Sequence, residues 1–141
     1  MTVVVDASVG LKWFSEEKDT DAALALVREA KSLIAPDLIV PEVCNGAWRL
    51  VRQKVMRLDQ IERIAHTLTT TLEEIVPTVS FAQQAMAIAG SLDHPAYDCF
   101  YLALAEAYEV RMITADQRLL RRVQNTPWEK RTLALGERQA F

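Results

Sequence analysis

The chain has 141 residues, of which 50% are hydrophobic and 25% are charged, and its formal net charge is −3 at pH 7. This length and composition predict one globular domain over residues 1–141, and no apolar run approaches the ~20 residues that a membrane span needs. No basic region precedes the first apolar run, so it does not resemble a signal peptide and we expect a cytoplasmic protein. We expect Cys44 and Cys99 to be buried, reduced thiols, since two cysteines make neither a disulfide framework nor a zinc site.

Short predicted strands alternate with predicted helices along the chain. In chain order we expect a strand over 2–6, a short helix, a helix over 19–31, a strand over 32–35, helices over 36–54 and 58–73, a strand over 74–79, helices over 81–91 and 96–108, a strand over 111–114, a helix over 116–124 and a strand over 132–135. Ser8 is placed to cap the first short helix, and Pro41 suggests a break or a late start in its helix. The alternation predicts an α/β fold with three layers, α/β/α, around a short and mainly parallel central sheet.

Two carboxylates stand where predicted strands end. Asp6 follows the apolar run of the first strand, and Asp116 follows the strand over 111–114. In parallel sheets the chemistry collects beyond the carboxyl ends of the strands, so we expect both side chains at one edge. Each of them could instead cap the helix that begins after it.

Two further carboxylates fall in the first turns of predicted helices. Asp98 opens an almost wholly apolar helix. The helix dipole favours a negative charge there, but such a helix is buried, and a buried ionised aspartate must be paired, hydrogen-bonded or bound to a metal. Glu42 shares a helical stripe with Asn45, Arg49 and Gln53. That stripe either faces solvent or presents a carboxylate, an amide and a guanidinium to one pocket.

Several carboxylates gathered at one site would repel one another. Two of them about 4 Å apart repel by about 1 kcal/mol in water and by about 4 kcal/mol at the dielectric of a protein edge. A fold that gathers several usually holds a hard divalent cation, and Mg²⁺ favours carboxylate oxygens together with retained waters. The four acids therefore point to metal-dependent phosphodiester chemistry, although spacing alone does not identify the reaction. His66 and His94 are not at a metal-ligand spacing.

Basic residues cluster in two segments in spite of the negative net charge. Five basic residues against two acidic ones lie between Arg49 and Arg63, and seven against three lie between Arg111 and Arg138. Local basic surface beside an acidic pocket suits a phosphate backbone. Solvated helix faces with i,i+4 pairs explain either segment alone equally well.

Four runs of the sequence resemble the motifs of PIN-domain nucleases, and among them the VapC-type ribonuclease toxins of type II toxin–antitoxin modules. The runs are VVVDAS at 3–8, PEVCNG at 41–46, YDCFYLALAE at 97–106 and ITAD at 113–116. The resemblance extends from Thr2 to about Leu135 with the runs in the family's order, and the third run is the most specific. It implies a PIN-like version of the three-layer fold.

The resemblance also implies a site and an activity. The implied catalytic carboxylates are Asp6, Glu42, Asp98 and Asp116. The three aspartates would be ligands of Mg²⁺ or Mn²⁺, and the glutamate would ligate the metal or position the attacking water. Ser8 and Thr114 match small hydroxyl positions that support the acids by hydrogen bonds. The implied enzyme is an endoribonuclease that leaves a 5′-phosphate and a 3′-hydroxyl.

The implied partners are an RNA substrate, a protein antitoxin and a second copy of the chain. Trp13 and Phe14 could form part of a groove for the antitoxin, or they pack in the core. Asp93 is either an extra acid of the site or a loop and capping residue. The candidates for holding the RNA backbone are Lys12, Arg49, Arg118 and Arg121.

Two other functions compete with this hypothesis. A phosphotransfer enzyme or receiver domain also has an aspartate after its first strand, but a haloacid-dehalogenase-type site needs a second aspartate where this chain has Ser8. A receiver needs adjacent acids at that strand end and a lysine after a late strand. A non-catalytic module that binds RNA and an antitoxin through its basic helices leaves the four carboxylates without a role. The RNA target cannot be read from these motifs.

Overall fold

The computed structural model describes residues 1–137 and contains a five-stranded sheet in the order β3-β2-β1-β4-β5. The strands are β1 (Thr2–Val5), β2 (Ser32–Pro36), β3 (Glu74–Val76), β4 (Arg111–Thr114) and β5 (Thr132–Ala134). Every pair of neighbouring strands is parallel. The predicted α/β fold and its five short strands are confirmed. Arg138, which ends the second basic segment, lies outside the described residues.

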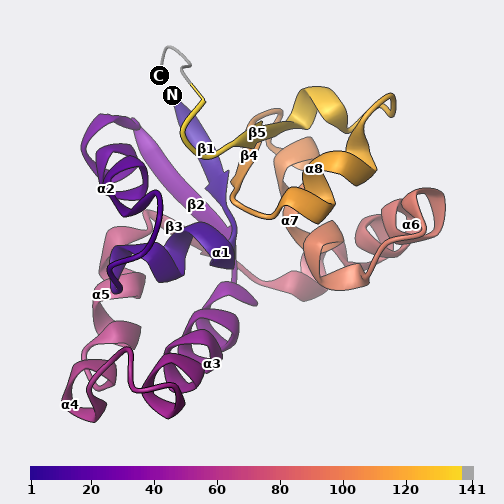
Figure 1. The fold of residues 1–141 in the computed structure, drawn as a ribbon. Coiled ribbons are helices and arrows are strands. Elements are labelled where there is room, and N and C mark those ends of the chain that lie inside the picture. Colours follow the sequence, from indigo (N-terminus) through magenta and orange to yellow (C-terminus); the bar gives the residue numbers. More distant parts are fainter. Residues whose placement is uncertain (138–141) are drawn as a thin grey trace.

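Helices lie on both faces of this sheet. They are α1 (Ala7–Gly10), α2 (Thr20–Glu29), α3 (Ile39–Arg52), α4 (Leu58–Ile61), α5 (Ile64–Thr71), α6 (Ala82–Leu92), α7 (Ala96–Ala107) and α8 (Gln117–Val123), with 3-10 turns η1 (Leu11–Trp13), η2 (Thr78–Phe81) and η3 (Glu129–Arg131). Parallel crossovers are right-handed, so connections that run from β1 toward β3 and those that run toward β5 cross opposite faces. Figure 1 shows α2 and α5 on one side of the strands and α7 and α8 on the other. This is the predicted three-layer arrangement.

The core is centred on β1 and α7. Val3, Val4 and Val5 are fully buried, as expected for a strand covered on both faces. Helix α7 packs across β2, β1 and β4, and it buries Cys99 and every residue from Tyr101 to Ala105. Cys99 and the half-buried Cys44 are free thiols. Within residues 1–137, no helix is long and apolar enough to cross a membrane.

The local structure differs from the prediction at several points. The strand predicted over 74–79 ends at Val76, before Pro77, and a 3-10 turn follows over Thr78–Phe81. The helix predicted over 58–73 is divided into α4 and α5 by a turn at Glu62 and Arg63. Both residues keep right-handed helical dihedrals, so the hydrophobic periodicity continues through the turn and could not reveal it. Helix α1 is capped by Asp6 and not by Ser8, whose backbone N–H donates to the Asp6 carboxylate. Pro41 lies in the first turn of α3, where no helical hydrogen bond needs its missing N–H, and the helix continues without a break.

The strand order brings the first and fourth strands together at the centre of the sheet. Val5 of β1 is in register with Ile113 of β4, and the Asp6 N–H donates to the Ile113 carbonyl at 3.2 Å. From β1 the chain proceeds toward one edge of the sheet, and from β4 it proceeds toward the other. Such a switch in direction leaves a crevice beyond the carboxyl ends of the two strands, where ligands bind in open α/β sheets.

Candidate active site

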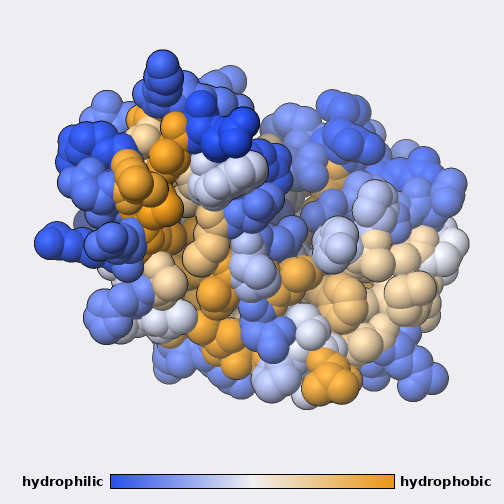
Figure 2. Space-filling model, turned by 90° about the horizontal axis from the view of Figure 1, so that it is seen from below, coloured by the Kyte–Doolittle hydropathy of each residue, from blue (hydrophilic) through white to orange (hydrophobic). Residues whose placement is uncertain are grey.

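A pocket of about 730 Å³ opens at the carboxyl-terminal edge of the sheet. It is lined by all four of the predicted catalytic carboxylates: Asp6, Glu42, Asp98 and Asp116. Asn45 and Arg49 of the α3 stripe also line it. Figure 2 views the molecule from this edge and shows a band of hydrophilic side chains between two more hydrophobic areas. The fold therefore gathers acids that are up to 110 residues apart in the chain (116 − 6 = 110).

Asp6 is the most buried of the four acids, with 3% of its surface exposed. One carboxylate oxygen accepts hydrogen bonds from the backbone N–H and the hydroxyl of Ser8, and the other accepts from the Thr114 hydroxyl. The pKa of Asp6 is raised from 3.8 to about 6, mainly by burial and in part by the nearby Asp98 charge, while the hydrogen bonds from Ser8 and Thr114 lower it. An ionised Asp6 is therefore held at a cost in free energy that a bound cation would offset.

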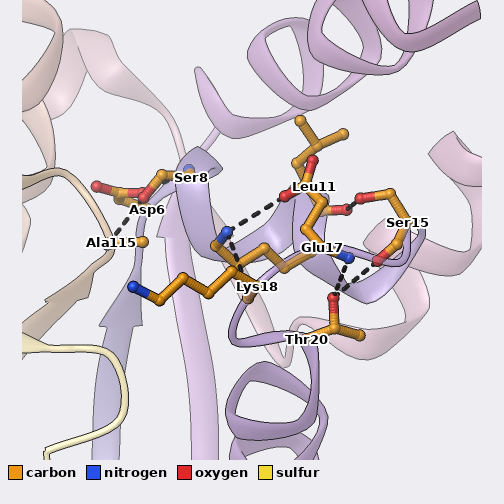
Figure 3. A network of polar contacts seen from close by, with 9 residues as sticks. Asp6, Ser8, Leu11, Ser15, Glu17, Lys18, Thr20 and Ala115 are labelled. Carbon is orange, nitrogen blue, oxygen red and sulfur yellow. Dashed lines mark hydrogen bonds and ion pairs between the residues drawn. The ribbon is translucent and has the colours of Figure 1, made fainter. Parts of the chain in front are cut away.

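Ser8 and Thr114 also connect Asp6 to the turn that follows β4. The Ser8 hydroxyl accepts from the Ala115 N–H at 3.0 Å, and the Thr114 hydroxyl accepts from the Asp116 N–H at 3.0 Å. Figure 3 shows Asp6 and Ser8 pointing toward Ala115 from the end of β1. These bonds fix the two strand ends against each other, which agrees with the supporting role implied for the two hydroxyls.

Asp116 combines the two roles that the sequence left open. Its carboxylate caps α8, accepting from the Arg118 N–H at 2.9 Å and from the Leu119 N–H at 3.4 Å. The same residue lines the acidic pocket. Asp6 likewise caps α1 and lines the pocket. Capping therefore does not compete with a place in the site, since it fixes the orientation of each carboxylate.

Glu42 is held by a partner that the sequence analysis missed. The Tyr101 hydroxyl donates to the Glu42 carboxylate at 2.6 Å, and Tyr101 is only 1% exposed. Burial raises the pKa of Glu42 and the Asp98 charge adds to the rise, while the hydrogen bond from Tyr101 lowers it. Burial and the Glu42 carboxylate together raise the pKa of Tyr101, so its hydroxyl remains a donor. Tyr101 follows Asp98 by three residues, and this spacing puts both on one face of α7.

Asp98 also has a partner that the sequence analysis missed. His94 Nε2 lies 2.6 Å from the Asp98 carboxylate, with 7% of the His94 side chain and 25% of the Asp98 side chain exposed. The two residues are four apart at the start of α7, a spacing that could have revealed the pair. His66, in contrast, is exposed.

The comparisons with known proteins agree with this geometry. The family model described as "PIN domain" matches residues 3–125. The chain belongs to the PIN domain family. Ribonuclease VapC3 of Pyrobaculum aerophilum is 30% identical over 122 residues, which cover 84% of this chain and 92% of that protein. Ribonuclease VapC9 of Mycobacterium tuberculosis is 30% identical over 117 residues, which cover 83% of this chain and 87% of that protein.

Solved structures share the fold of this PIN domain. A toxin–antitoxin complex from Klebsiella pneumoniae has a chain that superposes with a TM-score of 0.71 at 18% identity, covering 96% of this chain and 99% of that one. The VapBC2 structure from Rickettsia felis, bound to a promoter DNA fragment, has a chain with a TM-score of 0.63 at 11% identity, covering 95% and 98%. At these identities the likeness concerns the fold alone.

The pocket of the PIN domain suits a hard cation by the chemistry of its donors. Four carboxylates line it, and Arg49 is the one lysine or arginine among the lining residues. Mg²⁺ keeps several waters and needs only one or two direct carboxylates. In residues 1–137, however, no three His, Cys, Asp or Glu side chains are arranged so that they could hold one metal ion. The structure thus brings the acids to one pocket but not into a shared coordination shell, and metal binding stays a prediction.

Of the four predicted RNA-binding residues, only Arg49 is among those that line this pocket. Arg118 and Arg121 are exposed on α8, which Asp116 caps. Lys12 forms an ion pair with Glu17 at 3.2 Å and donates to the Lys18 carbonyl, within the turn drawn in Figure 3. The structure thus uses Lys12 to hold the turn that precedes α2.

Asp93 is not among the residues that line the acidic pocket. It is the C-cap of α6, with φ of 49°, and its 98% exposed side chain forms an ion pair with Arg122 at 3.5 Å. This supports the capping interpretation of Asp93.

Proposed function

We propose that this PIN domain is a Mg²⁺- or Mn²⁺-dependent endoribonuclease and the toxin of a toxin–antitoxin pair. The observation that carries the proposal is the arrival of four carboxylates, from four separate parts of the chain, in one pocket with Asp6 buried. Relatives named ribonuclease VapC and fold neighbours from toxin–antitoxin complexes support it. We expect the protein to act in the cytoplasm, to form a homodimer and to bind an antitoxin.

Of Asp6, Asp98 and Asp116, one or two would ligate the cation directly and the others would hold it through its retained waters. A divalent ion there would supply positive charge against the scissile phosphate and lower the pKa of a water. Ser8 and Thr114 fix both oxygens of Asp6, and the first amides of α8 fix Asp116. His94 fixes Asp98 in the same way. The acids are therefore oriented before any substrate arrives.

Glu42 is the proposed base of the reaction. Its raised pKa, caused mainly by burial, makes its carboxylate a better proton acceptor for the attacking water. Tyr101 orients that carboxylate through its hydrogen bond. Arg49 lies in the same lining, where its guanidinium would neutralise a phosphate oxygen of the RNA. Cleavage by this route would leave a 5′-phosphate and a 3′-hydroxyl.

A second, larger groove of about 1250 Å³ is the proposed site for the antitoxin. Trp13 and Phe14 line it while packing partly against the core, and Trp13 Nε1 donates to the Ala23 carbonyl at 2.9 Å. Core packing of these aromatic residues therefore does not exclude the proposed contact with an antitoxin. Exposed Leu24 and Val55 lie in the same groove beside the acidic Glu16, Glu17, Asp19 and Asp21, so its proposed occupant is a peptide segment with both apolar and basic side chains. Loss of co-purification of the protein encoded alongside upon Val55→Glu would support this assignment, and unchanged recovery would contradict it.

Cleavage of RNA by the purified protein tests the enzymatic proposal. We expect hydrolysis in Mg²⁺ that stops in chelator and is lost in Asp98→Asn. Asp59→Asn is the matched control, because Asp59 is 74% exposed in α4 and pairs only at the surface with Arg57. A wild-type rate in Asp98→Asn would contradict the assignment. Binding of RNA without turnover, unchanged by chelator, would instead support the non-catalytic module.

A further inference from the structure

Two exposed aromatic side chains stand close to the acidic pocket without a role in the scheme above. Tyr97 is 63% exposed, lines the pocket and directly precedes Asp98 at the start of α7. Trp48 is 51% exposed on α3 and directly precedes Arg49, which lines the same pocket. Each aromatic residue therefore neighbours a pocket residue, and the two come from different helices that bound the pocket.

The helical phase of α3 places Trp48 at one flank of the face that lines the pocket, next to Pro41 and Asn45. The face of α3 that turns to the core carries Ile39, Val43 and Ala47. Residues 41, 45, 48 and 52 follow an i, i+4, i+7, i+11 spacing on the opposite, exposed face, and the first two of them line the pocket. With a rise of about 1.5 Å per residue, Trp48 lies about 9 Å along the helix from Glu42. An RNA strand leaving the pocket along α3 would meet it within about two nucleotides.

Arg52 already holds Trp48 in a stacked arrangement. The Arg52 guanidinium carbon lies 5.4 Å from the centroid of the Trp48 ring. Both residues are exposed, and Asn45 and Arg49 on the neighbouring turns are exposed and polar. A surface that binds protein usually presents several contiguous apolar residues. A single aromatic ring backed by guanidinium groups matches instead what single-stranded nucleic acid needs, a face for stacking beside charges for phosphate.

Resting on the proposed RNA cleavage, we propose that Trp48 and Tyr97 stack on nucleobases that flank the scissile phosphate. The phosphate lies over the four carboxylates, with Arg49 beside it. One neighbouring base stacks on Trp48, whose ring Arg52 orients, and a base on the α7 side stacks on Tyr97. Such stacking requires bases that are not paired or stacked on each other, so the cleaved segment is single-stranded or looped. Neither side chain donates to the reaction itself.

Steady-state cleavage of a single-stranded RNA tests the proposal through KM and kcat. For Trp48→Ala and for Tyr97→Ala we expect KM to rise about 10-fold, the effect of losing one base stack, with kcat within about twofold of wild type. Trp48→Phe should recover most of the affinity because a phenyl ring still stacks. Tyr108→Ala is the matched control, since Tyr108 is an aromatic residue, 41% exposed, at the other end of α7. Its KM should stay at the wild-type value.

Abasic nucleotides identify the stacked positions directly. Once the cleavage site is mapped, RNAs that lack one base on either side of it are compared in wild type and Trp48→Ala. We expect one abasic position to raise the wild-type KM about 10-fold and to have no further effect in Trp48→Ala. An abasic position on the other side of the cleavage site should also raise the wild-type KM and should have no further effect in Tyr97→Ala.

The outcomes separate the stacking proposal from the proposed function. No cleavage by the wild-type protein in Mg²⁺ contradicts both. Cleavage with an unchanged KM in Trp48→Ala and Tyr97→Ala contradicts the stacking proposal alone. A Trp48→Ala protein that loses dimer mass in solution while keeping its KM assigns Trp48 to a protein interface and overturns the proposal. If Trp48→Ala and Tyr97→Ala raised KM by the same factor for intact RNA and for every abasic RNA, that result would also overturn the proposal.

Discussion

The two ends of the same sheet carry opposite charges in two different settings. At the carboxyl-terminal end, four carboxylates line a pocket of about 730 Å³ and Asp6 is 3% exposed. At the amino-terminal end, a hollow of about 660 Å³ is lined mainly by cations and by the first residues of the chain. Its charged lining residues are Lys31, Glu109, Arg111, Lys130 and Arg131, and each is half-buried or exposed.

The difference between these ends is desolvation rather than the number of charges. Like charges that keep their water repel weakly, by about 1 kcal/mol at 4 Å, whereas burial multiplies the repulsion and penalises the ionised form. The raised pKa values of Asp6 and Glu42 show that penalty at the carboxyl-terminal end. We therefore expect substitutions there to have large effects on chemistry and on pH dependence, and substitutions at the amino-terminal end to have small ones.

Asp6→Asn should have the largest effect of these substitutions. It should strongly decrease the rate of RNA cleavage without lowering the stability of the fold. Loss of one ligand of a catalytic metal should lower kcat at least about 100-fold. In chelator the pKa of Asp6 is higher in the folded chain, about 6, than its ordinary value of 3.8. The folded state therefore binds the proton more tightly, and the wild-type free energy of unfolding should fall by about 2 kcal/mol as pH rises from 4 to 6, out of about 3 kcal/mol over the whole titration.

Urea unfolding at pH 4, 5 and 8 in chelator measures this contribution. The Asp6→Asn protein lacks the titrating group, so its stability relative to wild type should increase with pH and level off above about pH 7. A difference between the two proteins that stays constant from pH 4 to pH 8 would show that Asp6 is not desolvated as the structure indicates.

Tyr101→Phe should have an intermediate effect at the carboxyl-terminal end. It removes the hydroxyl that lowers the pKa of Glu42, so that pKa should rise and the acidic limb of the pH–rate profile should move to higher pH. Loss of one hydrogen bond to a charged group predicts a decrease of about 10-fold in kcat at neutral pH. A profile that keeps its wild-type acidic limb would remove Glu42 from the role of base.

The double substitution Lys130→Glu and Arg131→Glu should have the smallest effect. Both residues lie at the amino-terminal end, where solvent reaches the side chains, so the free energy of unfolding should change by less than about 0.5 kcal/mol each. Cleavage in Mg²⁺ should stay within about twofold of wild type. A decrease in kcat as large as that expected for Tyr101→Phe would indicate that RNA contacts the basic amino-terminal end. It would contradict the expected difference between the two ends of the sheet.

The sequence predicted the fold and the gathering of the acids better than it predicted their partners. Alternating strands and helices, with Asp6 and Asp116 at strand ends, were enough to expect both at one edge of a parallel sheet. Periodicity predicts the polar stripe on α3, but the packing of the helix decides whether that stripe faces the pocket or solvent. The turn between α4 and α5 was missed because its residues keep helical dihedrals.

The partners of the acids depend on tertiary contacts that local patterns do not encode. Tyr101 is 59 residues from Glu42 in the chain, so their hydrogen bond required the packing of α7 beside α3. The spacing of His94 predicts no metal ligand, whereas the structure pairs it, from the loop before α7, with Asp98. In both cases the missed residue positions a predicted one.

Binding of a divalent cation to the metal-free protein tests the central claim most directly. Isothermal titration with Mn²⁺ should show saturable binding to the wild type and to the control Asp59→Asn, and at least about 10-fold weaker binding to Asp98→Asn. Equal Mn²⁺ affinity in Asp98→Asn and wild type, or no binding to either, would contradict the account of the acidic pocket as a metal site.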